Sequence, residues 1–269
     1  MKPSRIKSTI IVILALVNVC LLILLVSRRT QERAARSHTV AQLTRLYGES
    51  GVELPAALVP AESLRLAAVD LARDLSAEAA FAEALLGPCA SEDVGGGIYR
   101  YVGQSGQCLL RASGAVEATL DRAVDDPEAF LTSLFDAHGY AASYSSLSSN
   151  GSGTVVAVRA LPDAAVFNAE LTLTFEQNRL LSAAGFFIPP VVSAGEYGGG
   201  ISGVTALVRF LDHSKTSGEI CTAVTGVRGG YLLQNAASIS QRLIPAWCID
   251  TDVIQYYVNS ITGEVTRGT

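Results

Sequence analysis

Four cysteines are the residues of this sequence whose type and spacing most directly suggest chemistry. The chain has five cysteines in total, and the fifth, Cys20, lies in an apolar N-terminal segment. An even number of thiols in the body of the chain permits three disulfide pairings. If the body lies outside the cytoplasm, we expect Cys89–Cys108 and Cys221–Cys248, each joining a strand or its lead-in to a neighbouring strand. In a reducing compartment, the same four residues are buried free thiols.

Metal and catalytic chemistry find little support in the sequence. Zinc sites need close ligand pairs such as C-x-x-C, and the sequence has none. Asp250-Thr251-Asp252 offers two carboxylates to a calcium ion, but a β-turn between strands explains these residues as well, because Asp favours turns. The glycine runs at 95–97 and 198–200 lack the continuation that cradles phosphate, and no G-x-S-x-G nucleophile motif occurs. The histidines stand apart from one another: His38, His138 and His213. The sequence therefore predicts no catalytic, metal-binding or cofactor-binding site, and no enzyme.

Composition sets further bounds on the function. The chain has 269 residues, of which 49% are hydrophobic and 17% charged, and these values exclude a disordered chain. Residues 1–36 hold seven Lys or Arg against one acidic residue, which leaves 13 basic and 24 acidic residues and a net charge of −11 over 37–269. Phosphate contacts need clustered basic side chains, so an acidic body excludes nucleic acid as the main partner.

The N-terminal segment predicts a membrane anchor. Thr9–Val26 is an uncharged run that spans about 27 Å as a helix, close to the hydrocarbon thickness of a bilayer. A cleaved signal peptide has a shorter apolar region and a small-residue cleavage site, whereas Ser27-Arg28-Arg29 follows here. We expect a single-pass membrane anchor at 9–26, a cytoplasmic tail at 1–8 and an extracytoplasmic body. The amide of Asn18 either contacts a partner helix or is simply tolerated in the span.

The body shows helical periodicity in three places. After a stalk at 27–55, apolar positions recur at helical spacing over 61–86. Asp126-Pro127 has the order of a helix start, with Gly139 as the stop, which predicts a helix to about His138. A third, short helix is expected over 203–211.

Strands are expected after each helix, and the pattern predicts an α+β fold with antiparallel meanders. A helix leading into a meander occurs at about 127–188 and again at 203–266, which we interpret as a degenerate duplication. This interpretation predicts a first α+β subdomain at 56–190 and a second at 191–269. The expected strands are 98–102, 107–112, 115–120, 140–147, 154–161, 166–175, 180–188, 220–227, 231–234, 243–251 and 254–258.

Both ends of the chain resemble a known family. Ser4-Arg5-Ile6-Lys7-Ser8, the apolar span and Gly51-Val52-Glu53-Leu54-Pro55 resemble the start of YycI-type proteins. The C-terminal part is the sharper match and resembles the closing hairpin of YycH/YycI proteins and, more loosely, PepSY-like modules. It has Pro245 and Trp247 on one strand, Tyr256-Tyr257-Val258-Asn259 on the next, and then Thr262-Gly263-Glu264-Val265. Trp247 and the alternating Tyr and Val residues would pack a small sheet that the Thr262-Gly263 turn closes.

The resemblance implies a membrane-anchored accessory protein of a two-component regulatory system. Such a protein has no catalytic activity and binds a sensor histidine kinase that controls cell-wall metabolism, partly through its transmembrane helix, with a sister YycH-like protein as a second partner. The alternative is a PepSY-like extracytoplasmic inhibitor or chaperone of a secreted hydrolase. A third reading is an envelope enzyme with an unrecognised site. Replacing the anchor by an unrelated span separates the first reading from the second.

Overall fold

The computed structural model describes residues 17, 18, 20–22, 31, 34–161, 164–190, 199–235 and 241–268. Most of the expected anchor at 9–26 lies outside these residues. Within them, no helix combines the length and the apolar character that crossing a bilayer requires. The chain divides into two compact units, Met1–Val59 and Pro60–Thr269. In the first unit, 34–49 is helical and lies within the range expected for the stalk, 27–55. A short 3-10 helix, η1, covers Ala56–Leu58.

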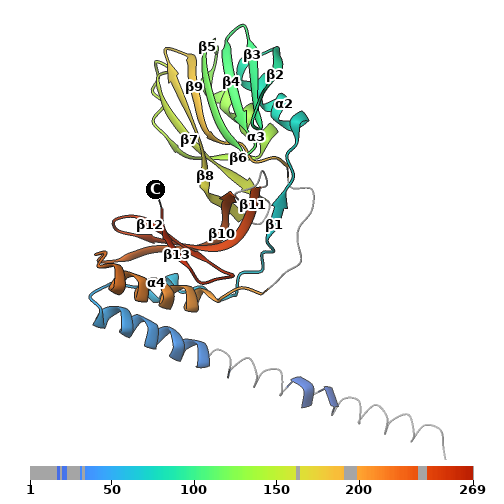
Figure 1. The fold of residues 1–269 in the computed structure, drawn as a ribbon. Helices are drawn as coiled ribbons and strands as arrows, with labels where there is room; N and C mark the ends of the chain where they lie inside the picture. Colours follow the sequence, from blue (N-terminus) through green and yellow to red (C-terminus); the bar gives the residue numbers. More distant parts are fainter. Residues whose placement is uncertain are drawn as a thin grey trace, which may run out of the picture. The chain divides into compact units, whose positions relative to one another are not determined.

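In the second unit, the described residues form a helix followed by four strands three times in succession (Figure 1). The two occurrences expected from the sequence are present, and a third precedes them. The first comprises α2 (Leu75–Leu86), β2 (Cys89–Gly95), β3 (Ile98–Gly103), β4 (Gly106–Arg111) and β5 (Ala115–Ala123). The second comprises α3 (Pro127–His138), β6 (Tyr140–Ser145), β7 (Gly153–Leu161), β8 (Ala164–Glu176) and β9 (Arg179–Phe186). The third comprises α4 (Gly203–Ser217), β10 (Val224–Asn235), β11 (Gln241–Thr251), β12 (Gln255–Asn259) and β13 (Val265–Arg267).

The strands of the described residues pair into one connected, almost entirely antiparallel sheet, as the α+β class predicts. The first two groups are joined where β5 pairs with β9. The strand order across them is β2-β3-β4-β5-β9-β8-β7-β6. The third group is a meander, β10-β11-β12-β13, and α4 runs beside it in Figure 1. One parallel pair, Val166 on β8 opposite Tyr231 on β10, links the two parts.

The helix predicted after Asp126-Pro127 is α3, and its ends follow the sequence signals. The Asp126 carboxylate accepts hydrogen bonds from the backbone N–H groups of Glu128 and Ala129. Gly139 ends the helix in the left-handed conformation, with φ of 66°. Both ends were predictable because N-cap Asp and C-terminal Gly satisfy backbone groups that the helix itself leaves unpaired.

The helix predicted over 61–86 is wrong in its first half. Helix α2 begins at Leu75, after the N-cap Asp74, and a short strand, β1 (Val69–Leu71), pairs with β11. Val69 and Leu71 are buried while Asp70 is exposed, which is the period of a strand. In so short a run, this period is hard to separate from helical spacing, and the Asp74 cap decides the start of the helix.

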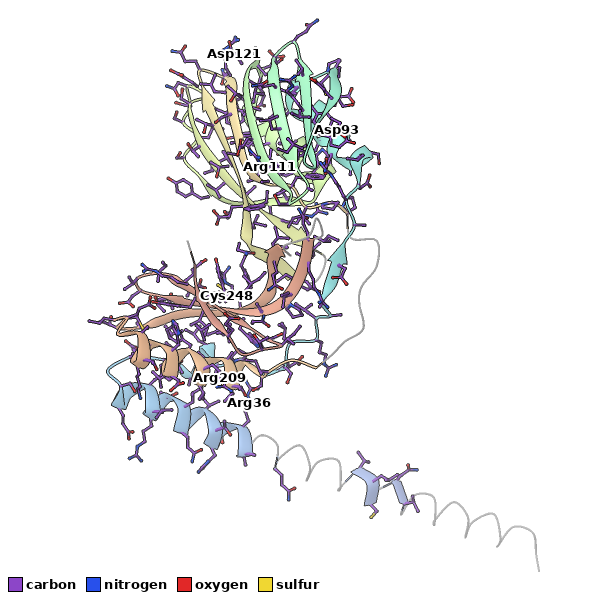
Figure 2. The ribbon with its side chains drawn as sticks, in the orientation of Figure 1. Arg36, Asp93, Arg111, Asp121, Arg209 and Cys248 are labelled. Atoms are coloured by element: carbon purple, nitrogen blue, oxygen red, sulfur yellow. The ribbon has the colours of Figure 1, made fainter. Side chains whose placement is uncertain are left out.

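Two expectations about strands also need correction. The strands expected at 220–227 and 231–234 are one continuous strand, β10. Gly229 and Gly230 do not form a turn there, because their missing side chains leave space for Leu64 and Phe167 to pack against the strand. A Cβ atom at Gly230 would lie 2.4 Å from the ring of Phe167, and one at Gly229 would lie 2.3 Å from Leu64. Strand β2 was not expected, because its Ala-Ser-Glu-Asp run has no apolar alternation. It is an exposed edge strand, and Figure 2 labels its Asp93.

The largest apolar core lies between α2, α3 and the sheet that β2 to β9 form. The helices contribute Phe81, Leu85, Leu131 and Leu134. The sheet contributes Leu110, Val116, Val155, Leu171, Leu173 and Leu180. A second cluster joins β1, β8, β10 and β11 through Val69, Val166, Tyr231 and Leu243.

Candidate functional site

The residues that carry the family resemblance lie on two neighbouring strands. Pro245 and Trp247 are on β11, and Trp247 lies opposite Val258 on β12. The indole Nε1–H donates to the backbone carbonyl of Ile201 at 3.0 Å. The turn after β12 contains Gly263, whose φ is 74° and whose N–H donates to the carbonyl of Asn259 at 2.8 Å.

The two tyrosines of this hairpin are packing residues. The ring of Tyr256 lies 4.9 Å from that of Phe210 on α4, and the ring of Tyr257 stacks on Phe167 at 5.9 Å. Burial raises the pKa of each phenol to about 12. Neither hydroxyl is therefore suited to proton transfer near neutral pH.

An open groove of about 700 Å³ lies beside Trp247. The segment 60–66, which precedes β1, forms much of its lining together with Gly229 and Trp247. Glu62 and Arg65 of that segment are exposed, so the groove combines apolar residues such as Leu64 with charged side chains of both signs. This combination suits a protein segment better than a small polar substrate.

The four cysteines of the body are free thiols in the structure. Burial raises the pKa of Cys108 and of Cys248 to about 12. Burial also raises the pKa of Cys89 and of Cys221. Because the thiolate is the nucleophile, these thiols are poorly reactive in the folded chain. The expected pairings Cys89–Cys108 and Cys221–Cys248 do not fit the strand register. Strand β3 separates Cys89 on β2 from Cys108 on β4. Cys248 lies opposite Arg228 on β10, whereas Cys221 precedes that strand, and a disulfide needs Cα atoms within about 7 Å of each other.

The acidic residues near Cys248, which Figure 2 labels on β11, already have structural partners. Asp250 pairs with Arg228 at 3.0 Å, and the Cys248 thiol lies 3.5 Å from the same carboxylate. Asp252 accepts hydrogen bonds from the backbone and hydroxyl of Thr222. The carboxylates considered for calcium are thus engaged separately. Among the described residues, His, Cys, Asp and Glu form no group of three that could hold a metal ion.

The remaining candidates lie apart from the hairpin. Asn18 and His38 belong to the Met1–Val59 unit and are exposed. His213 on α4 lies 3.9 Å from the carboxylate of Glu219. His138 ends α3 and packs edge-on against Phe81, with 5.2 Å between the ring centroids.

One buried residue, Arg159 on β7, was not singled out from the sequence. Val155, Ala157 and Arg159 alternate along β7 and are all buried. The signal was available, because the period of a strand puts Arg159 on the same inward face as the apolar residues before it. A charged residue at an apolar position of such an alternation is a candidate for a binding role.

Comparisons with solved structures give structural similarities, among them two at 10% sequence identity. No protein-family model matches the chain, and no curated protein sequence matches it. The chain is similar to an uncharacterized protein from Eubacterium rectale ATCC 33656, at 10% identity and a TM-score of 0.46, over 77% of this chain and 86% of that one. It is also similar to the Bacillus megaterium YpeB C-terminal domain, at 10% identity and a TM-score of 0.38, over 75% of this chain and 99% of that domain.

Proposed function

We propose that this chain is a non-catalytic, membrane-anchored regulator that binds a two-component sensor histidine kinase controlling cell-wall metabolism and modulates its activity. Its N-terminus would be cytoplasmic, its anchor would lie at 9–26, and its body would lie outside the bacterial cell membrane. A sister YycH-like protein is the expected second partner. The resemblance of both chain ends to the YycH/YycI family is the basis of this proposal.

The observation that carries the proposal is the position of the Trp247 hairpin. The strand that bears the most specific part of the resemblance also lines the 700 Å³ groove. In this account, the groove receives an extended segment of the kinase's extracytoplasmic domain. Leu64 offers a half-buried apolar contact beside the buried Trp247. Glu62 and Arg65 offer charged contacts of the kind that set partner choice at the edge of an interface.

The state of the reactive groups supports a binding role. The thiols of Cys108 and Cys248 and the phenols of Tyr256 and Tyr257 have raised pKa values. Groups that act as nucleophiles or general bases need the opposite shift, toward the operating pH.

Co-purification from the native membrane tests the proposal. Tagged full-length protein is cross-linked, and its partners are identified by mass spectrometry, for the wild type, for a chain with 9–26 replaced by an unrelated span, and for Asn18→Leu. We expect a sensor histidine kinase with the wild type and its loss on replacement of the span. If Asn18→Leu recovers less kinase than the wild type, the Asn18 amide contributes to kinase binding. Recovery of a secreted hydrolase, retained after replacement of the span, would overturn the proposal in favour of an inhibitor or chaperone.

A further inference from the structure

Arginines in the interior of the β2–β9 part of the fold differ in how they are paired. The guanidinium of Arg73 makes two contacts with the Glu78 carboxylate, at 2.7 and 2.8 Å. The guanidinium of Arg122 donates to the backbone carbonyls of Ala84 and Leu85 at the end of α2. Both charges therefore have compensating partners within the fold, as buried or partly buried charges normally do.

Arg159 has no such compensation among the described residues. It is 7% exposed, and its Nε has no hydrogen-bond partner. Its guanidinium carbon lies 5.8 Å from the ring centroid of Tyr140, directly opposite on β6. Burial lowers its pKa, which is the mark of a cation without a nearby anion. A buried charge without a partner is costly, so its presence calls for an anion.

Arg159 lines a cavity of about 360 Å³ that is large enough for a small ligand. The cavity wall is otherwise mainly apolar. Its other lining residues include Ala77, Ala80, His138, Phe187 and Pro190. The cavity therefore combines one buried cation with a surface that suits a short hydrocarbon group.

The local sequence keeps this cavity open. Ala77 and Ala80 place small side chains of α2 against it. Gly139 also lines the cavity, and a Cβ atom there would lie 2.4 Å from Nη1 of Arg159. The glycine that ends α3 is thus also the residue that lets the guanidinium approach the chain.

His138 adds a second polar group beside Arg159. Burial, and next the charge of Arg159, lower the pKa of this imidazole, so it is neutral at pH 7. A neutral imidazole can donate one hydrogen bond and accept another. It can therefore orient a bound anion without adding a second buried charge.

We propose that this cavity binds the carboxylate of a small ligand through Arg159, with the ligand's apolar group against Phe187, Pro190 and the α2 alanines. An arginine fork matches the two oxygens of a carboxylate. The carboxylate can belong to a free short-chain acid or to the C-terminus of a short peptide. This inference does not depend on the kinase as partner, because it concerns a cavity distinct from the Trp247 groove.

Calorimetric titration of the full-length protein in lipid nanodiscs tests the proposal. The probes are 4-methylpentanoate, its uncharged amide, and N-acetyl-alanyl-leucine with a free C-terminal carboxylate. We expect one of the acids to bind with a Kd of about 1 mM or tighter, and the amide to bind at least about tenfold more weakly. The acid that binds identifies the source of the carboxylate. Failure of both acids to bind at this level would overturn the proposal.

Variants separate a binding role of Arg159 from a structural one. Arg159→Met should abolish binding while leaving the ligand-free protein as stable as the wild type or more stable, because it removes an uncompensated buried charge. Arg179→Met, which removes an exposed guanidinium paired with Asp121 on the same sheet, is the matched control and should bind like the wild type. Unchanged binding by Arg159→Met, or a large loss of stability without ligand, would contradict the proposal.

A final variant tests whether the chain supplies its own anion. In the body, the acidic residues outside the described ranges are Asp163 and Glu196. If Arg159 binds a carboxylate from outside the chain, the double variant Asp163→Asn, Glu196→Gln has a Kd for the acid within about threefold of the wild-type value. If the double variant binds at least about tenfold more tightly, one of these carboxylates occupies Arg159 and the proposal is wrong.

Discussion

The Glu78 carboxylate and the Arg73 guanidinium form a two-point ion pair that joins the segment before α2 to the first turns of that helix. Glu78 is 4% exposed, and Arg73 also donates to the backbone carbonyls of Gly97 at 2.8 Å and Leu110 at 3.3 Å. The hydrogen bonds to Glu78 raise the pKa of Arg73, and they outweigh the burial of the guanidinium, which lowers it. This pair therefore fastens α2 to the β3–β4 part of the sheet.

Breaking this pair should cost much more than breaking a surface pair. Glu78→Gln leaves the mostly buried Arg73 charge without its anion, and we expect the free energy of unfolding to fall by about 3 kcal/mol. The control is Glu92→Gln, whose partner Arg100 is exposed, with an expected change below about 1 kcal/mol. Urea denaturation followed by circular dichroism measures both. Equal losses in the two variants would show that burial does not set the strength of the Arg73–Glu78 pair.

The two glycines that end helices in the left-handed conformation should differ in their tolerance of a side chain. Gly139 after α3 has φ of 66°, and Gly218 after α4 has φ of 71°. A Cβ atom meets nothing within 4 Å at Gly218 but would lie 2.4 Å from Arg159 at Gly139. Gly218→Ala should therefore cost about 1 kcal/mol from backbone strain, and Gly139→Ala clearly more. Melting of the two variants under one condition gives the comparison, and an equal cost would refute the proposed close approach.

The stability of the fold should depend on the protonation of His138. Because its pKa is lowered in the folded chain, the unfolded chain takes up the proton first as the pH falls. The folded state is therefore favoured above the unfolded pKa of about 6.5 and loses this advantage below it. We expect the free energy of unfolding to fall more between pH 7.5 and pH 5 for the wild type than for His138→Asn. Parallel pH profiles would contradict the burial of a neutral imidazole.

The buried thiols should react slowly. With the pKa of Cys108 and Cys248 at about 12, alkylation of the reduced, folded protein at about pH 8 should be at least about a hundredfold slower at these residues than in urea. Peptide mapping after iodoacetamide treatment gives the rate at each cysteine. Modification of Cys108 as fast as in the unfolded chain would mean that β4 opens readily.

Local signals in the sequence predicted the parts of the fold that local interactions fix. The ends of α3 were predictable from Asp126 and Gly139. The Asp126 side chain caps the first turn of the helix, and Gly139 takes the left-handed conformation just after the last turn. The start of α2 and the short strand β1 were mispredicted, because the pairing of β1 with β11 depends on residues far away in the chain. The continuity of β10 likewise depends on distant contacts, those of Phe167 and Leu64 with its glycines.

The candidate sites were predictable to a similar extent. The pairing of the strands that carry Trp247 and Tyr257 followed from the expected meander, whereas the groove beside them depends on the 60–66 segment, which the sequence suggested was helical. Arg159 could be placed on the inward face from the alternation of β7 alone. That it lacks a partner among the described residues could not be predicted, since this depends on which acidic side chains the fold brings near.

Site-specific photocross-linking in the native membrane tests the central claim most directly. A benzophenone amino acid is placed at Asn18 in the expected anchor, at Ser63 in the groove segment, and at Thr216 on the exposed side of α4 as the control. The account predicts that irradiation joins the Asn18 and Ser63 variants to a sensor histidine kinase and leaves the Thr216 variant unlinked. Cross-links from Ser63 to a secreted hydrolase, or none to a kinase from either position, would contradict it.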